Sequence, residues 1–206
     1  MNQNKKRILT LVAFGAMVFS TISFTQAYFT DRQVVTNTFE VGSVNIELQE
    51  PSFEEVENAI PTKIYDKDPQ IVNTGENEAY VYLEVKIPTY DVVTSDSDGT
   101  KLASKESELF NIVDLNTTDW EQIGTKTTQD NITTYVYGYK NKLAINETTE
   151  PLFTKIQFAN LIEGQMIDTT NMEESTLNVE VKAMAIQAEE TGTMLEAYDK
   201  YIKQNQ

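Results

Sequence analysis

An alternation of apolar and polar side chains with period two is the feature that most constrains the fold of this chain. Its clearest example lies between residues 79 and 87, where Ala79, Val81, Leu83, Val85 and Ile87 alternate with Tyr80, Tyr82, Glu84 and Lys86. This pattern predicts a β-strand with one buried and one wet face, because successive side chains of a strand point to opposite sides. Pro88 is expected to end the strand, since proline has no N–H for the hydrogen bonds of a sheet.

Three other segments also predict strands. Residues 177–185 repeat the alternation, and residues 152–159, LFTKIQFA, also have the pattern of a strand. Residues 133–140 place three tyrosines on one face, namely Tyr135, Tyr137 and Tyr139.

The apolar alternation changes phase near residue 42. Val35, Phe39 and Val41 share odd positions, whereas Val44, Ile46 and Leu48 take even ones. A slip of one residue would turn the apolar set to the solvent face of the strand. Gly42 and Ser43 are therefore predicted to form a bulge or bend that restores the phase.

Two segments predict short helices instead of strands. One spans residues 104–115. The other spans residues 193–203, with Met194, Tyr198 and Tyr201 at helical spacing and Thr191 or Thr193 as the N-cap. Many short strands with such helical excursions predict an all-β fold, an antiparallel β-sandwich. Because no linker interrupts the pattern, residues 28–206 are expected to form one domain.

The first 27 residues have the pattern of a secretory signal peptide. Lys5, Lys6 and Arg7 precede an uncharged run, residues 8–24. As a helix that run would span about 26 Å, slightly less than the ~30 Å hydrocarbon core of a membrane. Small residues follow, so cleavage is predicted after Ala27, with Thr25 at the −3 position and Tyr28 as the new N-terminus. The alternative is an uncleaved N-terminal anchor.

Charge and composition exclude several classes of function. The chain carries 16 basic and 32 acidic residues, a net charge of −16, which argues against a nucleic-acid partner because phosphates attract Lys and Arg. It also has no His and no Cys. The usual general base, the usual zinc ligands and the nucleophiles of Ser-His and Cys-His enzymes are therefore missing.

No motif predicts a catalytic or metal site. The sequence TSDSDGT, residues 94–100, has the look of a calcium loop, but Thr94 and Lys105 stand where an EF-hand needs acidic residues. A solvated turn is the preferred interpretation. We therefore expect no catalytic residue, no metal ligand and no cofactor.

The N-terminal part of the mature chain resembles a known family. In the TasA and camelysin family, secreted by Gram-positive bacteria and released by a SipW-type signal peptidase, an aromatic pair and an Asp or Asn follow the cleaved Ala. An N-x-F-x-x-G-x-h-x-h segment comes next, where h is apolar. The residues that match are Ala27, Tyr28, Phe29, Asp31, Asn37, Phe39, Gly42, Val44 and Ile46. Residues 67–88, 135–158 and 179–190 are also similar to segments of this family.

The resemblance implies a jelly-roll-like sandwich that polymerises into extracellular fibres of a biofilm matrix. It implies that residues 28–39 of one subunit add a strand to the next, burying Tyr28, Phe29, Val34, Val35 and Phe39. The implied partners are further copies of the chain, a SipW-type signal peptidase and an accessory anchoring matrix protein. The implied location is the extracellular matrix or the cell surface, with no membrane attachment after cleavage.

Two other functions stay open. A monomeric surface adhesin or ligand-binding sandwich is favoured by tyrosines that the strand patterns place on exposed faces, Tyr80, Tyr82, Tyr135 and Tyr137. A camelysin-type metallo-endopeptidase is less favoured. Without His or Cys its metal ligands would all be oxygens, which suit calcium or magnesium better than catalytic zinc. We therefore expect the protein not to be an enzyme.

Overall fold

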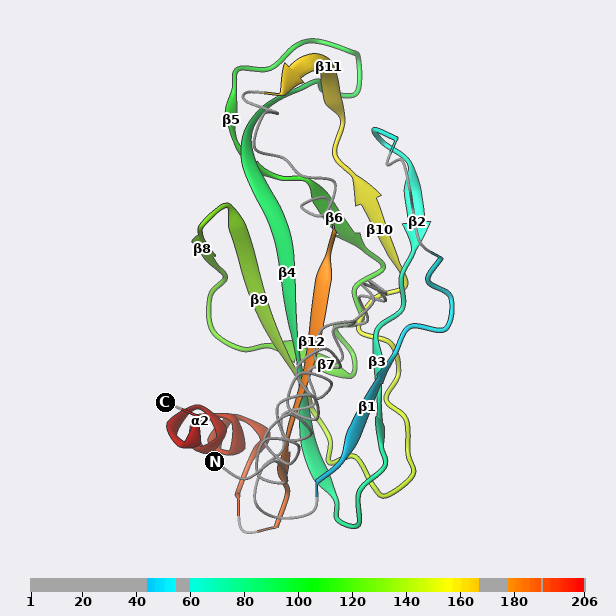
Figure 1. Ribbon diagram of the computed structural model, residues 1–206, viewed down its shortest axis with the longest axis vertical. Helices are drawn as coiled ribbons and strands as arrows, with labels where there is room; N and C mark the ends of the chain where they lie inside the picture. The colour runs from blue at the N-terminus through cyan, green and yellow to red at the C-terminus, as the bar shows by residue number, and fades with distance from the viewer. Residues whose placement is uncertain (1–43, 55–59, 167–177, 190, 206) are drawn as a thin grey trace, which may run out of the picture. The chain divides into compact units, whose positions relative to one another are not determined.

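Strands dominate the part of the chain that the computed structural model describes, which comprises residues 44–54, 60–166, 178–189 and 191–205. These residues belong to one compact unit, residues 34–206. The strands are β1 (Ile46–Gln49), β2 (Ile64–Asp66), β3 (Gln70–Asn73), β4 (Ala79–Thr94), β5 (Lys105–Glu108), β6 (Phe110–Val113), β7 (Trp120–Gln122), β8 (Thr127–Gln129), β9 (Ile132–Tyr139), β10 (Lys155–Phe158), β11 (Leu161–Met166) and β12 (Glu180–Gln187) (Figure 1). The described helix is α2 (Met194–Gln204). All strand pairs are antiparallel, which confirms the predicted all-β antiparallel fold.

Strand β4 organises the first layer of the fold. It runs between β9 and β12 (Figure 1), pairing with β12 along residues 79–86 and with β9 along residues 82–88. The C-terminal part of β4 pairs with β5 and β11. The side chains of Val81, Leu83 and Val85 are fully buried, as the alternation predicts. β4 therefore contributes the centre of the core.

Pro88 does not end this strand, so that prediction was wrong. β4 continues to Thr94 because its neighbour on one side changes at this point: β4 pairs with β12 up to Lys86 and with β5 from Thr89 onward. The N–H of Thr89 donates to Asn131 on the β9 side (2.8 Å), so the nitrogen of Pro88 faces the other side. On that side the carbonyl of Pro88 accepts from the N–H of Leu109 (2.8 Å), while the carbonyl of Leu109 accepts from Ala159 (2.9 Å), so the missing N–H of Pro88 leaves no acceptor unpaired.

The second layer combines two small sheets. β1 pairs with β3, and β10 pairs with β2 on one side and β6 on the other. Between β2 and β3, hydrogen bonds from Lys67 to Thr154 and from Leu152 to Pro69 keep the chain beside the segment that leads into β10. One core cluster joins both layers, drawing Leu83 and Val181 from the first and Ile46 and Ile156 from the second. The arrangement is the predicted β-sandwich.

The helix predicted at residues 104–115 is not formed. This segment makes β5 and β6, with the fully buried Leu109 between them donating its N–H to the carbonyl of Pro88 (2.8 Å). The apolar spacing fits a short helix, but β5 pairs with β4 and β6 pairs with β10. Tertiary pairing therefore overrides the local preference.

The C-terminal helix is confirmed. Thr193 is its N-cap, and the capping box is complete because Thr193 and Glu196 each accept a hydrogen bond from the other's backbone N–H. The helix packs on β12 and β9. Beneath it lie Tyr80, Tyr82, Met184 and Ile186, all buried. The face of β4 that the alternation predicts to be wet is thus covered at its N-terminal end.

Gly138 on β9 gives α2 room to dock. A Cβ at this position would overlap the sulfur of Met194 and lie 3.1 Å from Ile123 Cδ1. We expect Gly138→Val to lower the free energy of unfolding by about 1–3 kcal/mol, because it overpacks the contact between helix and sheet. Urea unfolding followed by circular dichroism measures the loss. The loss caused by Gly138→Val should be smaller when it is measured in a Met194→Ala background, and equal losses in the two backgrounds would contradict this explanation.

Candidate functional site

The edge strands of the two layers lie side by side. β1 is an edge of the second layer, β12 is an edge of the first, and the two strands contact each other (Figure 1). Within the described residues their backbones form no ladder with each other. We call this place the β1/β12 seam.

The outward groups of β12 follow from its register. Ala188 donates its N–H to Glu78 (2.9 Å), so even-numbered residues of β12 exchange hydrogen bonds with β4. The N–H and C=O groups of Val181, Ala183 and Ala185 therefore point away from β4. Their side chains belong to the sandwich core, and two of the three are only methyl groups.

The same reasoning applies to β1. Thr74 donates to the carbonyl of Asn45 (2.9 Å), which sets odd-numbered residues of β1 toward β3. The backbone groups of Ile46 and Leu48 point away from β3. Both seam strands thus have backbone donors and acceptors that point away from their own sheets, beside a shared apolar core, and an edge strand of this kind can pair with an added strand.

A buried ion pair fixes the end of β1. Glu50 directly follows the strand, and its two carboxylate oxygens lie 2.8 Å and 2.9 Å from Lys67 Nζ. Lys67 is 3% exposed, and its ammonium group lies 4.3 Å from the centre of the Phe53 ring. The N–H of Ser52 donates to Asp68 (2.9 Å) beside it. These contacts hold the segment after β1 against the corner between β2 and β3.

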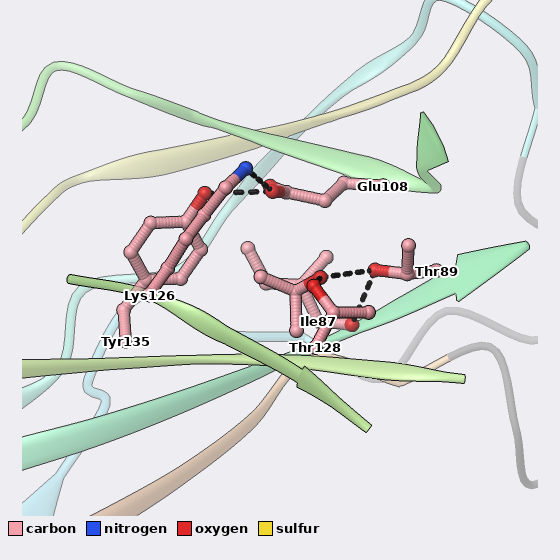
Figure 2. Close-up of polar contacts among 7 residues, drawn as sticks. Ile87, Thr89, Glu108, Lys126, Thr128 and Tyr135 are labelled. Carbon is pink, nitrogen blue, oxygen red and sulfur yellow. Dashed lines mark hydrogen bonds and ion pairs between the residues drawn. The ribbon is translucent and has the colours of Figure 1, made fainter. Parts of the chain in front are cut away.

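A second polar cluster consists of Glu108, Lys126 and Tyr135, and its tyrosine lies on β9 (Figure 2). Glu108 Oε1 accepts from Lys126 Nζ (2.6 Å) and from the Tyr135 hydroxyl (2.7 Å). The hydrogen bond to Glu108 raises the pKa of Lys126, while burial and then the hydrogen bond to Glu108 raise the pKa of Tyr135. These groups are paired with one another. The cluster ties β5, the loop after β7 and β9 together.

A chain of threonine hydroxyls lies near that cluster. The hydroxyl of Thr133 is 2.7 Å from that of Thr89 and 2.9 Å from that of Thr128, and Thr89 donates to the carbonyl of Ile87 (3.1 Å). Figure 2 shows Thr89 and Thr128 beside the Glu108 group. Thr89 and Thr133 are buried. Their hydrogen bonds satisfy hydroxyls inside the sandwich, which is a structural role.

The tyrosines do not form the exposed surface that the adhesin hypothesis requires, so this expectation was wrong. Tyr80, Tyr82 and Tyr137 are 7%, 0% and 4% exposed, and Tyr135 is half-buried. Burial raises the pKa of Tyr137 to about 12. The first two lie under α2, and the third faces the core between the layers. The tyrosine argument for the adhesin is therefore lost.

The carboxylates do not gather into a metal centre within the described residues, where no group of three or more Asp, Glu, His or Cys side chains is found. In the loop at residues 94–100, Asp96 and Asp98 accept hydrogen bonds from the backbone and side chain of Thr100. Those bonds, that of the Thr100 side chain first, lower the pKa of Asp98 to about 2. The two carboxylates hold a solvated turn, as predicted.

The residues predicted for cleavage and assembly lie outside the described part of the chain. They are Thr25, Ala27 and Tyr28 for cleavage, Tyr28, Phe29, Val34, Val35 and Phe39 for the added strand, and Gly42 and Ser43 for the bend. Neither the β1/β12 seam nor the Glu50–Lys67 pair is predicted by the sequence patterns. The small residues Ala183 and Ala185 were a sequence signal for the seam. No pattern distinguished Lys67 from the other basic residues of the chain.

Within the described residues, no helix is both long and apolar enough to cross a membrane.

Comparison with known proteins shows that residues 3–192 match the family described as camelysin metallo-endopeptidase. No curated protein and no solved structure matches the chain. The match includes every described strand and stops before α2. The chain therefore belongs to the camelysin metallo-endopeptidase family.

Proposed function

We propose that this chain is a secreted structural subunit that assembles when residues 28–39 of one copy add a strand at the β1/β12 seam of the next. The seam is the observation that carries the proposal. It offers the outward backbone groups of Ile46 and Leu48 on one side and those of Val181, Ala183 and Ala185 on the other. An incoming extended segment would find hydrogen-bonding partners and an apolar core together.

The position of the seam in the chain supports the same proposal. In the sequence, residues 28–39 precede β1 (Ile46–Gln49), one of the two seam strands, by only a few residues. They include Tyr28, Phe29, Val34, Val35 and Phe39, which are aromatic or β-branched and suit a strand. The edge is preformed, so only the incoming segment must lose conformational entropy.

Export and processing complete the proposal. Residues 1–27 direct secretion, and a SipW-type signal peptidase cleaves before Tyr28, which frees the segment for assembly. The product is a fibre of the extracellular matrix or cell surface, and an accessory matrix protein anchors it. Membership of the camelysin family and the antiparallel β-sandwich support this reading.

The test compares the chain of residues 28–206 with the chain of residues 39–206. We expect fibres in electron micrographs and fast sedimentation from the longer chain, and a monomer from the shorter chain, because the shorter chain lacks the added strand. Equal thermal unfolding of the two chains is the control for folding. If the longer chain also stays monomeric at high concentration, the assembly proposal is wrong and a monomeric surface protein becomes the better reading.

A further inference from the structure

We propose that this member of the family has no zinc-peptidase chemistry, although the family is described as metallo-endopeptidase. The residue types of this chain do not suit catalytic zinc. Catalytic zinc is held by three protein ligands with histidine or cysteine among them, as in His₃, His₂Glu and Cys₂His sites. None of the 206 residues of the sequence is His or Cys. Every zinc ligand would have to be an oxygen, and all-oxygen sites favour calcium or magnesium.

In the described part of the chain, the carboxylates do not converge in groups of three or more. The carboxylates shielded from solvent already have partners. Asp68 accepts a hydrogen bond from the backbone N–H of Ser52. Two others lie in ion pairs: Glu50 binds Lys67, and Glu108 binds Lys126 and Tyr135. Using either as a metal ligand would leave a partner without its hydrogen bond, and for Lys67 that partner is a buried charge.

A hydrolytic site also needs a catalytic base. A carboxylate that takes a proton from water near neutral pH needs a raised pKa, which burial or a neighbouring negative charge supplies. The pKa values of Asp98 and Glu196 are lowered instead, because hydrogen bonds from Thr100 and Thr193 stabilise their charged forms. Both groups are fully exposed turn or cap residues. Neither resembles the base of a hydrolytic site.

The chain is thus a family member whose sandwich serves a role other than zinc-dependent hydrolysis, and this conclusion is independent of whether it assembles. Any zinc-dependent casein hydrolysis in a preparation of the protein is therefore expected to come from another protein. Zinc bound by this acidic chain is held by scattered surface carboxylates, and excess calcium displaces it.

The test uses the full chain with its N-terminal segment, purified in the form that the cells produce. The protein is dialysed against zinc chloride, and its zinc content and thermal midpoint are measured with and without EDTA and with excess calcium. We expect less than one zinc per chain after dialysis, displacement of any remainder by calcium, and an unchanged thermal midpoint. In a casein gel we expect no clearing at the position of the chain, with thermolysin as the positive control.

Two results would overturn the proposal. One is a single zinc per chain that survives dialysis and calcium and whose removal by EDTA lowers the thermal midpoint. The other is zinc-dependent clearing in the casein gel at the position of the chain itself. The zinc content is read without any activity assay, so a protein that is inactive for other reasons does not escape the test.

Discussion

A chain of residues 28–206 carrying Ala183→Pro is expected to stay monomeric alone and to form a dimer when mixed with the chain of residues 39–206. The N–H of Ala183 points away from β4, so proline removes a donor from the seam without removing a hydrogen bond between β12 and β4. This variant can still donate its N-terminal strand. The shorter chain cannot donate a strand, but its seam is intact.

Each variant alone therefore lacks one half of the contact, and only the mixture restores a single complete contact. Sedimentation velocity distinguishes the monomers from a dimer that does not grow further. Ala183→Gly is the matched control, because it keeps the N–H while it also replaces the methyl group, and it should still form fibres. Fibres from Ala183→Pro, or a mixture that remains monomeric while the unmodified chain polymerises, would place the acceptor at another edge.

Glu50→Ala is expected to lower the free energy of unfolding by about 3 kcal/mol, because it leaves the ammonium group of Lys67 buried without its partner. This is the low end of the usual range for breaking a buried ion pair. The Glu50 side chain keeps 20% of its surface exposed, so water partly screens the pair. Urea unfolding followed by tryptophan fluorescence measures the change.

Two further variants separate the charge from the packing. Adding Lys67→Met to Glu50→Ala should recover most of the loss, since the buried site then holds no charge and the chain still packs against Phe53. Lys155→Met is the matched control, because it breaks the exposed pair with Asp114, whose side chains are 43% and 57% exposed. We expect it to change stability by less than about 1 kcal/mol. A Glu50→Ala loss as small as that of Lys155→Met would show that the pair is not effectively buried.

Agreement between sequence and structure is closest where the pattern is local. The alternation around Leu83 and Val181 predicted two strands and identified the side chains that meet in the core. Helical spacing with Thr193 as one of two candidate caps predicted α2. In both cases the side-chain period and the capping chemistry act within a few residues, so they can be read from the chain alone.

Disagreement arises where a residue's neighbour comes from far along the chain. Residues 104–115 have spacing that suits a helix, yet pairing with β4 and β10 makes them two strands. Pro88 reads as a strand end, yet the change from β12 to β5 at that point accommodates it. Tyr80 and Tyr82 read as exposed, yet α2 returns from more than a hundred residues later to cover them.

The all-β class, the core-facing residues of the main strands, the C-terminal helix and the lack of the residue types that catalytic zinc requires could all be read from the amino-acid sequence. The meeting of β1 and β12 at a seam, the pairing of Glu50 with Lys67 and the burial of the tyrosines became known only from the folded structure. The physical reason is that side-chain periodicity specifies which face of a strand is apolar. The neighbour of each strand depends on pairings between distant segments, whose energies no local pattern records.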